Sequence, residues 1–190
     1  GSTLALAYAQ AHPDRCLGMV LRGIFLNEQP EIDWFLYDMK MVFPESWEQF
    51  SAILEPEEHD NILDAYYKRL TSDDYHVKIE AAIRWSLYES ACSSLLPNYE
   101  TITTEEQKAH ALAVSRIEAH YFKHELISPE NSMLNGIDKI RHIPITTAYK
   151  LHQAWPEADY VVVPDGGHSA LDPAIRSRLI EATENAKTIR

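Results

Sequence analysis

Two glutamates lie on predicted helix faces that are otherwise apolar. Glu118 has Val114 four residues before it and Phe122 four residues after it, and Glu89 has Trp85 four residues before it; residues at this spacing share one helix face. Burying a carboxylate there is unfavourable unless a cation or hydrogen-bond donors compensate it. Two kinds of cation could compensate the carboxylates. One is a ligand ammonium, whose pKa near ~8 keeps it charged at neutral pH, and the other is an internal arginine. The internal candidates are Arg22, Arg84 and Arg116.

A histidine stands in a turn that follows an apolar run near the end of the chain. Residues 163–169 read Val-Pro-Asp-Gly-Gly-His-Ser, and His168 is the last histidine. Ligands of α/β sheets bind at the carboxyl ends of strands, so a general base fits this position. The alternative is a solvated loop histidine, and the turn alone leaves both open.

No serine of the chain is a satisfactory nucleophile. The segment GSTLALAYA at 1–9 is typical of the small-residue helix that packs under a nucleophile elbow, the turn G-x-S-x-G. We expect Gly1 to be the last glycine of such a motif, with its serine just outside this sequence. Ser2 suits a helix cap. Ser169 lies in an elbow-like segment, but Leu171 is too bulky for its final position and no histidine follows.

His120 and His124 form an H-x-x-x-H pattern on a predicted helix. A zinc site of this kind needs a third ligand and, in a metallopeptidase, the glutamate of H-E-x-x-H. Neither accompanies the pattern, so we expect two solvated histidines on a polar face. The sequence predicts no metal and no cofactor.

The elements that must position these residues are of two kinds. A helix over 3–12 followed by a buried parallel strand over 17–22 is typical of an α/β unit. From about residue 27 to residue 136, long amphipathic segments broken by prolines indicate an all-helical insert.

The α/β pattern returns after Gly136. Its predicted elements are strands over 143–145 and 160–163 and helices over 148–154 and 173–186. The strand and helix that meet at Thr146 and Thr147 lack the usual loop of about 2 to 6 residues, which suggests a skipped segment. The predicted domains are an α/β core at 1–27, a helical cap at 28–136 and a second core part at 137–190.

Charge and composition exclude some classes of partner. The chain of 190 residues has a net charge of −12. It contains no run of Lys and Arg to neutralise phosphates, so neither nucleic acid nor an anionic membrane is expected as a partner. No stretch approaches the roughly 18 apolar residues of a membrane span. Cys16 and Cys92 lack C-x-x-C spacing and predict a reducing, cytoplasmic setting.

Seven segments together resemble the proline iminopeptidases (prolyl aminopeptidases), α/β hydrolases that remove an N-terminal proline from peptides. The resemblance covers nearly the whole chain. Its segments are GSTLALAY at 1–8, LRGIFL at 21–26, WSLYE at 85–89, RIEAHYF at 116–122, IRHIP at 140–144, AWPEA at 154–158 and GHS at 167–169. The resemblance implies the C-terminal part of an α/β-hydrolase fold with an inserted all-helical cap, and peptides with N-terminal proline as substrates.

The resemblance also implies roles for single residues. His168 is expected to be the catalytic base, and Glu89 and Glu118 are expected to bind the imino group of the substrate. This agrees with the ligand-ammonium interpretation of the two acids. The other implied substrate-binding residues are Phe25, Phe122 and Phe35, which line a pocket for the pyrrolidine ring, and Arg22, which lies near the site.

Three parts of the family pattern are missing from the sequence. Only Gly1 represents the nucleophile motif G-G-S-W-G, and the H-G-G-P-G loop of the oxyanion hole is absent. The acid of a G-R-Y-D segment is skipped, with about 20 residues, between Thr146 and Thr147. We therefore expect this chain alone to lack peptidase activity. Two other functions stay open: a non-catalytic amine-binding or interaction module, and another capped α/β hydrolase such as an esterase or epoxide hydrolase.

Overall fold

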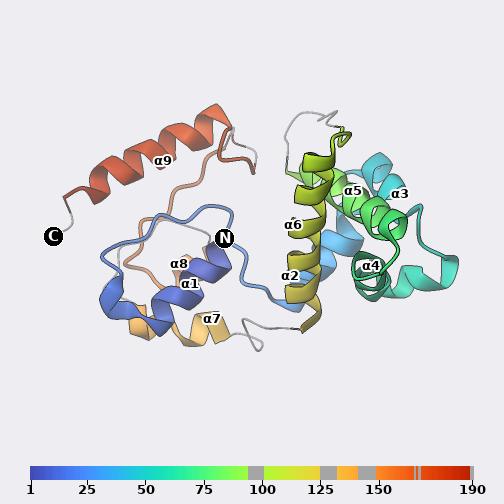
Figure 1. Cartoon of the computed structure of the whole chain (residues 1–190). Coiled ribbons are helices and arrows are strands. Elements are labelled where there is room, and N and C mark those ends of the chain that lie inside the picture. The colour runs from blue at the N-terminus through green and yellow to red at the C-terminus, as the bar shows by residue number, and fades with distance from the viewer. Residues whose placement is uncertain (94–100, 125–131, 141–148, 165, 167, 189–190) are drawn as a thin grey trace. The chain divides into compact units, whose positions relative to one another are not determined.

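The computed structural model describes residues 1–93, 101–124, 132–140, 149–164, 166 and 168–188, and the chain divides into two compact units (Figure 1). Unit 1 comprises Gly1–Glu28 and Ile127–Arg190, and unit 2 comprises Gln29–Leu126. Unit 2 is therefore one uninterrupted stretch, whereas unit 1 is assembled from the two stretches on either side of it. The assignment of core and cap at the predicted boundaries stays a prediction.

The ordered elements of unit 2 are helical in its described residues. The long helices are α5 and α6, and shorter ones pack beside them (Figure 1). The elements are α2 (Gln29–Asp33), the π-helical turn η2 (Trp34–Asp38), η3 (Met39–Met41), α3 (Pro44–Ser51), η4 (Pro56–Asn61), α4 (Ile62–Leu70), α5 (Tyr75–Cys92) and α6 (Glu105–His124). The amphipathic pattern of this part of the chain is thus realised as helices.

Local sequence signals explain where the two long helices begin. At the start of α5, the side chain of Asp74 accepts hydrogen bonds from the backbone N–H groups of His76 and Val77. At the start of α6, Thr104 and Gln107 cap each other reciprocally. Both arrangements satisfy backbone donors that the first helical turn leaves unpaired.

Aromatic rings fill the core between α3, α4 and α5. The ring of Phe50 stacks between those of Tyr66 and Tyr88, each at a centroid distance of 4.4 Å. Trp85 packs edge-on against Phe50 at 5.9 Å. All four side chains are buried, and burial of rings in such contacts stabilises a fold by several kcal/mol. This core holds Trp85 and Tyr88 firmly on the inner face of α5.

Small side chains allow α5 and α6 to approach each other closely. Ala82 of α5 and Ala119 of α6 are fully buried. The hydroxyl of Ser115 on α6 lies 3.4 Å from that of Ser86 on α5 and donates to the carbonyl oxygen of Ala82. Larger side chains next to this contact therefore meet across the two helices.

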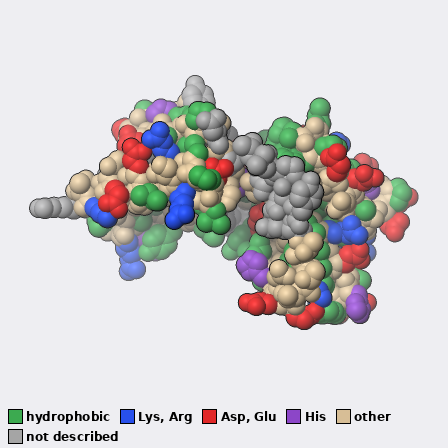
Figure 2. Space-filling view, turned by 90° about the horizontal axis from the view of Figure 1, so that it is seen from above, with side chains coloured by type: hydrophobic (Ala, Val, Ile, Leu, Met, Phe, Trp, Pro, Cys, Tyr) green, Lys and Arg blue, Asp and Glu red, His purple; other side chains and the backbone are tan. Residues whose placement is uncertain are grey.

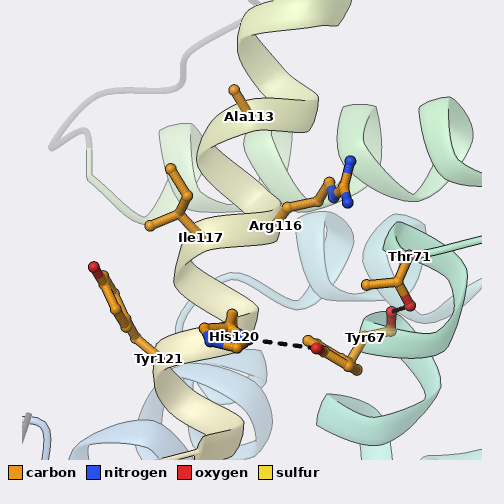
Figure 3. A pocket seen from close by; sticks show the side chains of 7 residues that line it. All are labelled: Tyr67, Thr71, Ala113, Arg116, Ile117, His120 and Tyr121. Atoms are coloured by element: carbon orange, nitrogen blue, oxygen red, sulfur yellow. Dashed lines mark hydrogen bonds between the residues drawn. The ribbon is translucent and has the colours of Figure 1, made fainter. Parts of the chain in front are cut away.

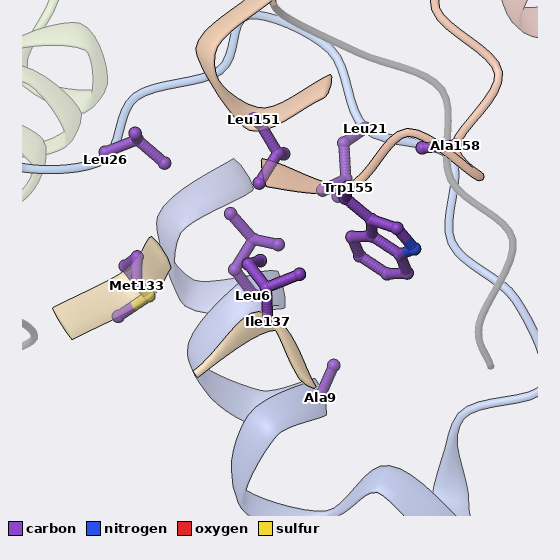
Figure 4. Packing of buried hydrophobic residues seen from close by; sticks show 9 residues of the cluster. All are labelled: Leu6, Ala9, Leu21, Leu26, Met133, Ile137, Leu151, Trp155 and Ala158. Atoms are coloured by element: carbon purple, nitrogen blue, oxygen red, sulfur yellow. The ribbon is translucent and has the colours of Figure 1, made fainter. Parts of the chain in front are cut away.

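Unit 1 contains shorter helices, and its buried apolar residues form one cluster (Figure 4). Its elements are α1 (Ser2–Ala11), η1 (Pro13–Arg15), α7 (Ser132–Asn135), η5 (Ile137–Ile140), α8 (Tyr149–Ala154) and α9 (Pro173–Ala186). Leu6 and Ala9 of α1 are buried in the cluster together with Leu151 and Trp155. The remaining members are Leu21, Leu26, Met133, Ile137 and Ala158. Residues from both stretches of unit 1 thus form its core.

The predicted helices of unit 1 are confirmed where the structure describes them. The helix predicted over 3–12 is α1, the one predicted over 173–186 is α9, and the one predicted over 148–154 is α8 from Tyr149 onward. The strand predicted over 143–145 and the join after it lie outside the described residues.

The strands predicted over 17–22 and 160–163 are wrong for this structure. Apart from an isolated bridge at Asp159, no residue in the described ranges is part of a sheet. Leu17 and Val162 are 70% and 64% exposed. A strand needs a neighbour that completes its hydrogen bonds and elements that cover its faces, and no described segment supplies them here. The sheet that the predicted α/β class requires is therefore not formed by these residues.

The surface carries both signs of charge. On the face shown in Figure 2, the coloured side chains place basic groups among acidic ones and form no continuous basic patch. A search of the described helices finds none with the length and apolar character needed to span a membrane.

Candidate functional site

Glu89 on α5 and Glu118 on α6 meet across the contact between the two helices, and we call them the carboxylate pair. Their side chains share a hydrogen bond, and burial together with the charge of Glu118 raises the pKa of Glu89 to about 7. Burial also raises the pKa of Glu118. Two carboxylates held together away from water do not both ionise readily. Burial and mutual repulsion therefore disfavour the state in which both carboxyl groups are ionised.

The indole of Trp85 provides the carboxylate pair with a hydrogen-bond donor. Its Nε1 donates to Oε2 of Glu118 over 2.9 Å. Among the residues that the structure describes, no lysine or arginine forms an ion pair with either carboxylate. Arg84 pairs instead with Glu80 at 3.1 Å, and Arg116 lines a different pocket. The internal-arginine interpretation is thus wrong for these two arginines.

Four aromatic side chains, which we call the aromatic wall, lie beside the carboxylate pair. The ring of Phe35 lies 5.7 Å from Trp85, 5.2 Å from Tyr88 and 6.3 Å from Phe122. Trp85 and Phe122 are 6.1 Å apart, and Phe122 follows Glu118 by one turn of α6. Apolar ring surface and negative charge therefore adjoin, which suits a ligand with an apolar body and a cationic nitrogen.

The π-helical turn η2 fixes the position of Phe35. Two backbone carbonyl groups of this turn accept hydrogen bonds from side chains of other helices. Tyr88 Oη donates to the carbonyl oxygen of Phe35 over 2.8 Å, and Trp47 Nε1 donates to the carbonyl oxygen of Leu36 over 3.0 Å. Short π-helical turns are rare in proteins overall, and those that occur often lie at functional sites. The sequence pattern did not indicate this turn.

In unit 1, His168 lies against Arg22 and Gly23. Nη1 of Arg22 donates to the carbonyl oxygen of His168. Gly23 has a φ of +55°, and a Cβ added there would lie 2.6 Å from Cε1 of the imidazole. Partial burial and the charge of Arg22 lower the pKa of His168. The imidazole is therefore neutral at pH 7, which is the state that a general base requires.

The start of α1 holds the segment that supports His168. The hydroxyl of Ser2 donates to the carbonyl oxygen of Gly23 at 3.0 Å and accepts from the N–H of Phe25 at 3.1 Å. Thr3 Oγ1 donates to the carbonyl oxygen of Phe25 at 2.5 Å. Both hydroxyls are buried. Ser2 is thus a structural hydroxyl that bridges two backbone groups, rather than the helix cap that the sequence suggested.

A separate pocket of about 410 Å³ lies on α6 and the end of α4 (Figure 3). His120 lines it, with Nδ1 3.3 Å from the hydroxyl of Tyr67, and His124 approaches the same hydroxyl at 3.5 Å. The other lining residues are Thr71, Ala113, Arg116, Ile117 and Tyr121. Both histidines contact the ring of Tyr67, while His124 is exposed and His120 is partly exposed. Among the described residues, no group of three or more His, Cys, Asp or Glu is placed to hold a metal ion.

The predicted site residues thus fall into two groups, one in each unit. Glu89, Glu118, Phe35 and Phe122 come together in unit 2, and His168 and Arg22 come together in unit 1, where Phe25 is held by α1. Sequence reasoning missed the donor role of Trp85 and the support of His168 by Gly23. The first depends on contact between two helices and the second on contact between the two stretches of unit 1. Asp165 and Gly167, beside His168, lie outside the described residues.

Comparison with known proteins adds a family and several relatives. The profile of the alpha/beta hydrolase fold matches residues 1–174. A protein named proline iminopeptidase from Arabidopsis thaliana is 42% identical over 205 aligned positions, which cover 100% of this chain and 54% of the relative. The probable proline iminopeptidase of Leptolyngbya boryana is 42% identical, with 97% of this chain and 62% of the relative covered. The proline iminopeptidase of Neisseria gonorrhoeae is 36% identical, with 97% and 63% covered.

The lengths in these comparisons differ in two ways. The chain spans little more than half of the Arabidopsis relative and less than two thirds of the other two. In addition, 205 positions are aligned to a chain of 190 residues, so the Arabidopsis protein has at least 15 residues inside the matched region with no counterpart here.

Proposed function

The chain belongs to the alpha/beta hydrolase family, and from this premise we propose that it supplies the substrate-recognising part and the catalytic histidine of a prolyl aminopeptidase. The observation that carries the proposal is the carboxylate pair beside the aromatic wall. An N-terminal proline presents a cationic secondary nitrogen on an apolar ring, which matches the charge and the surface of this arrangement.

The carboxylate pair accounts for the release of a terminal proline rather than cleavage within a peptide. The N–H groups of a free imino terminus donate to Glu89 and Glu118, and the pyrrolidine ring lies against Phe35 and Phe122. A blocked or internal proline brings no cation, so the negative charge of the carboxylate pair gains no compensation when such a peptide binds. The site therefore favours peptides with a free N-terminal proline as substrates.

His168 serves as the base in the proposed reaction. It accepts the proton of a serine hydroxyl while the serine oxygen bonds to the carbonyl carbon of the proline residue, and it returns the proton to the leaving amine. Water then releases proline from the acyl-enzyme by the same proton transfers. Arg22 holds the backbone of His168, and Phe25 contributes to the pocket for the ring. The proposed reaction uses no metal and no cofactor.

We propose further that these 190 residues do not hydrolyse peptides by themselves. The hydroxyl of Ser2 is engaged by backbone groups of Gly23 and Phe25, and that of Ser169 accepts from the N–H of Leu171 at 3.2 Å. Among the described residues, neither hydroxyl is hydrogen-bonded to the imidazole of His168. The additional aligned residues of the Arabidopsis relative support a skipped segment, which we assign to the position between Thr146 and Thr147.

Calorimetry with L-prolinamide tests the recognition part of the proposal. We expect binding to the chain at pH 7.5, no binding of N-acetyl-L-prolinamide, and affinity lowered on the order of tenfold or more by Glu118→Gln. Glu80→Gln is the control, because its side chain is 57% exposed on α5, the helix that carries Glu89. Equal binding of the blocked amide would instead favour a capped esterase or epoxide hydrolase, and no binding of either amide would refute the proposal.

An activity assay tests the catalytic part. We expect no release of arylamine from a proline arylamide by the purified chain. Turnover that His168→Ala abolishes would contradict the proposed inactivity while supporting the peptidase assignment. Binding without turnover is also the behaviour of an amine-binding module, and the intact carboxylate pair is the observation that keeps this second function open.

A further inference from the structure

We propose that a proton held between Glu89 and Glu118 joins the two carboxyl groups when no ligand is bound, that Trp85 assigns this proton to Glu89, and that a bound ammonium displaces it. The first two steps concern the protein alone. The third rests on the proposed function, because it requires a cationic substrate at the carboxylate pair.

The indole of Trp85 is held in place by the rings packed around it. Its side chain is fully buried and is surrounded by the rings of Phe50, Tyr66 and Phe35 at 5.9, 5.4 and 5.7 Å. An indole N–H is a donor only, so Oε2 of Glu118 must present a lone pair to it at 2.9 Å. This interaction favours the ionised form of Glu118.

Glu89 receives no such donor from the described residues apart from the interaction with Glu118. With Glu118 ionised, the hydrogen bond between the two carboxyl groups is donated by the O–H of Glu89. Glu118 then accepts from two sides, from Trp85 and from Glu89. The pair carries one negative charge instead of two, which lowers the electrostatic penalty of burial.

Within unit 2, the other titratable groups described around the pair remain neutral near pH 7. Cys92, one turn after Tyr88 on α5, has its thiol pKa raised to about 11 by burial and by the charge of Glu89. Burial raises the pKa of Tyr88 and of Tyr66, which comes from α4. The elements η2 and α6 contribute the uncharged rings of Phe35 and Phe122. A change near neutral pH is therefore assigned to the carboxylate pair.

The exchange of proton for ammonium conserves charge at the site. When a secondary ammonium binds, its two N–H groups donate to Glu89 and Glu118, the O–H bond of Glu89 breaks, and the proton passes to water. The site gains one positive charge from the ligand and loses one as the proton leaves. Below the pKa of Glu89, linkage then requires Kd to rise about tenfold for each unit by which pH falls. Above the pKa of the ligand nitrogen, near ~8, affinity falls again.

The indole N–H resonance of Trp85 tests the first two steps without ligand. In the full chain labelled with ¹⁵N-tryptophan, Trp85→Phe identifies the resonance. We expect its Nε1–H signal to move downfield with a midpoint near pH 7, because Glu118 loses the Glu89 donor and accepts more strongly from Trp85. Glu89→Gln, which keeps a donor at every pH, is expected to abolish the movement. Glu80→Gln on the exposed side of α5 is expected to leave it unchanged.

Two results of this titration would overturn the shared proton. One is a midpoint below pH 5 in the unaltered chain, and the other is a movement that survives Glu89→Gln. Neither result bears on whether the chain binds prolinamide, so failure here is separate from failure of the proposed function.

Calorimetry of prolinamide binding in two buffers of different ionisation enthalpy tests the third step. We expect close to one proton released per ligand at pH 6 and no net release at pH 8, where part of the free ligand is neutral and takes up a proton on binding. Glu89→Gln is expected to release none at either pH. Binding without proton release at pH 6 would refute the exchange and leave the proposed function standing. Absence of binding would refute both, while the indole titration still decides the shared proton.

Discussion

The imidazole of His168 rests on the backbone of Gly23, so closely that a methyl group at Gly23 would lie 2.6 Å from Cε1 of the ring. Gly23 also has a φ of +55°, which is the left-handed conformation that side chains disfavour. Glycine is therefore required at this position for two reasons: the left-handed backbone conformation and the close contact with the imidazole of His168.

Gly23→Ala is expected to displace His168 and to lower the free energy of unfolding by about 1 kcal/mol from backbone strain. Because the displaced ring leaves its partly buried place near Arg22, the pKa of His168 should rise toward the ordinary value for histidine. NMR titration of the imidazole measures this shift, and thermal unfolding measures the stability. In the double variant Gly23→Ala/His168→Ala, any loss caused by the ring contact should be recovered and only the strain should remain. A pKa of His168 unchanged by Gly23→Ala would contradict the contact.

Ser2→Ala is expected to destabilise the chain by about 1–2 kcal/mol, because the carbonyl of Gly23 and the N–H of Phe25 both lose their hydroxyl partner. Chemical denaturation followed by circular dichroism measures the change. Ser177→Ala, in an exposed part of α9, serves as the control and is expected to have an effect within about 0.5 kcal/mol. Equal effects of the two substitutions would show that the Ser2 bridge contributes little.

Glu89→Gln is expected to change how stability depends on pH. The pKa of Glu89 is raised from the ordinary 4.5 to about 7 in the folded state, so the folded chain binds more protons than the unfolded chain between these values. The stabilisation from this group is complete below pH 4.5 and is lost as pH rises through 7, by up to about 3 kcal/mol. Unfolding free energies of the unaltered chain and the variant, measured from pH 4 to pH 8, should therefore converge or cross. A constant difference over this range would count against the raised pKa.

Arg69→Lys is expected to destabilise unit 2 by about 1–3 kcal/mol. The guanidinium of Arg69 forms a bidentate ion pair with Glu58, the shorter contact being 2.6 Å, and also donates to the carbonyl oxygens of Ala65 and Ile53. A lysine ammonium cannot reproduce this planar set of donors. Urea denaturation measures the loss, with Arg178→Lys, whose side chain is 58% exposed, as the control. Similar midpoints for the two variants would contradict the role assigned to Arg69.

Local sequence signals were sufficient to predict the helices of unit 1 that the structure describes. The start of α9 follows from Pro173 in its first turn and from the cap by Asp172, both of which are local. The strands predicted over 17–22 and 160–163 failed for the opposite reason. An apolar run shows that a segment is suited to a sheet. Whether another segment pairs with it cannot be inferred from the residues of the run itself.

The candidate site shows the same difference between what local sequence signals predict and what depends on contacts with distant segments. Helical spacing placed Glu89 and Glu118 on apolar faces, and the structure leaves both of them only partly exposed. Spacing also suggested arginine as their internal partner, yet the described partner of Glu118 is Trp85, on the neighbouring helix and 33 residues away. Which donor reaches a buried acid depends on how two helices pack, and single-helix periodicity contains no information about that.

The division of unit 1 into two stretches has a consequence for the order of events during synthesis. Unit 2 is one continuous stretch rich in contacts between neighbouring helices, so it can form its core as soon as α6 has left the ribosome. Leu6 and Ala9 of α1 must wait for Leu151 and Trp155, more than 140 residues later. Until the residues that follow unit 2 are synthesised, only Leu21 and Leu26 of the cluster are available to α1, so the core of unit 1 is completed after that of unit 2.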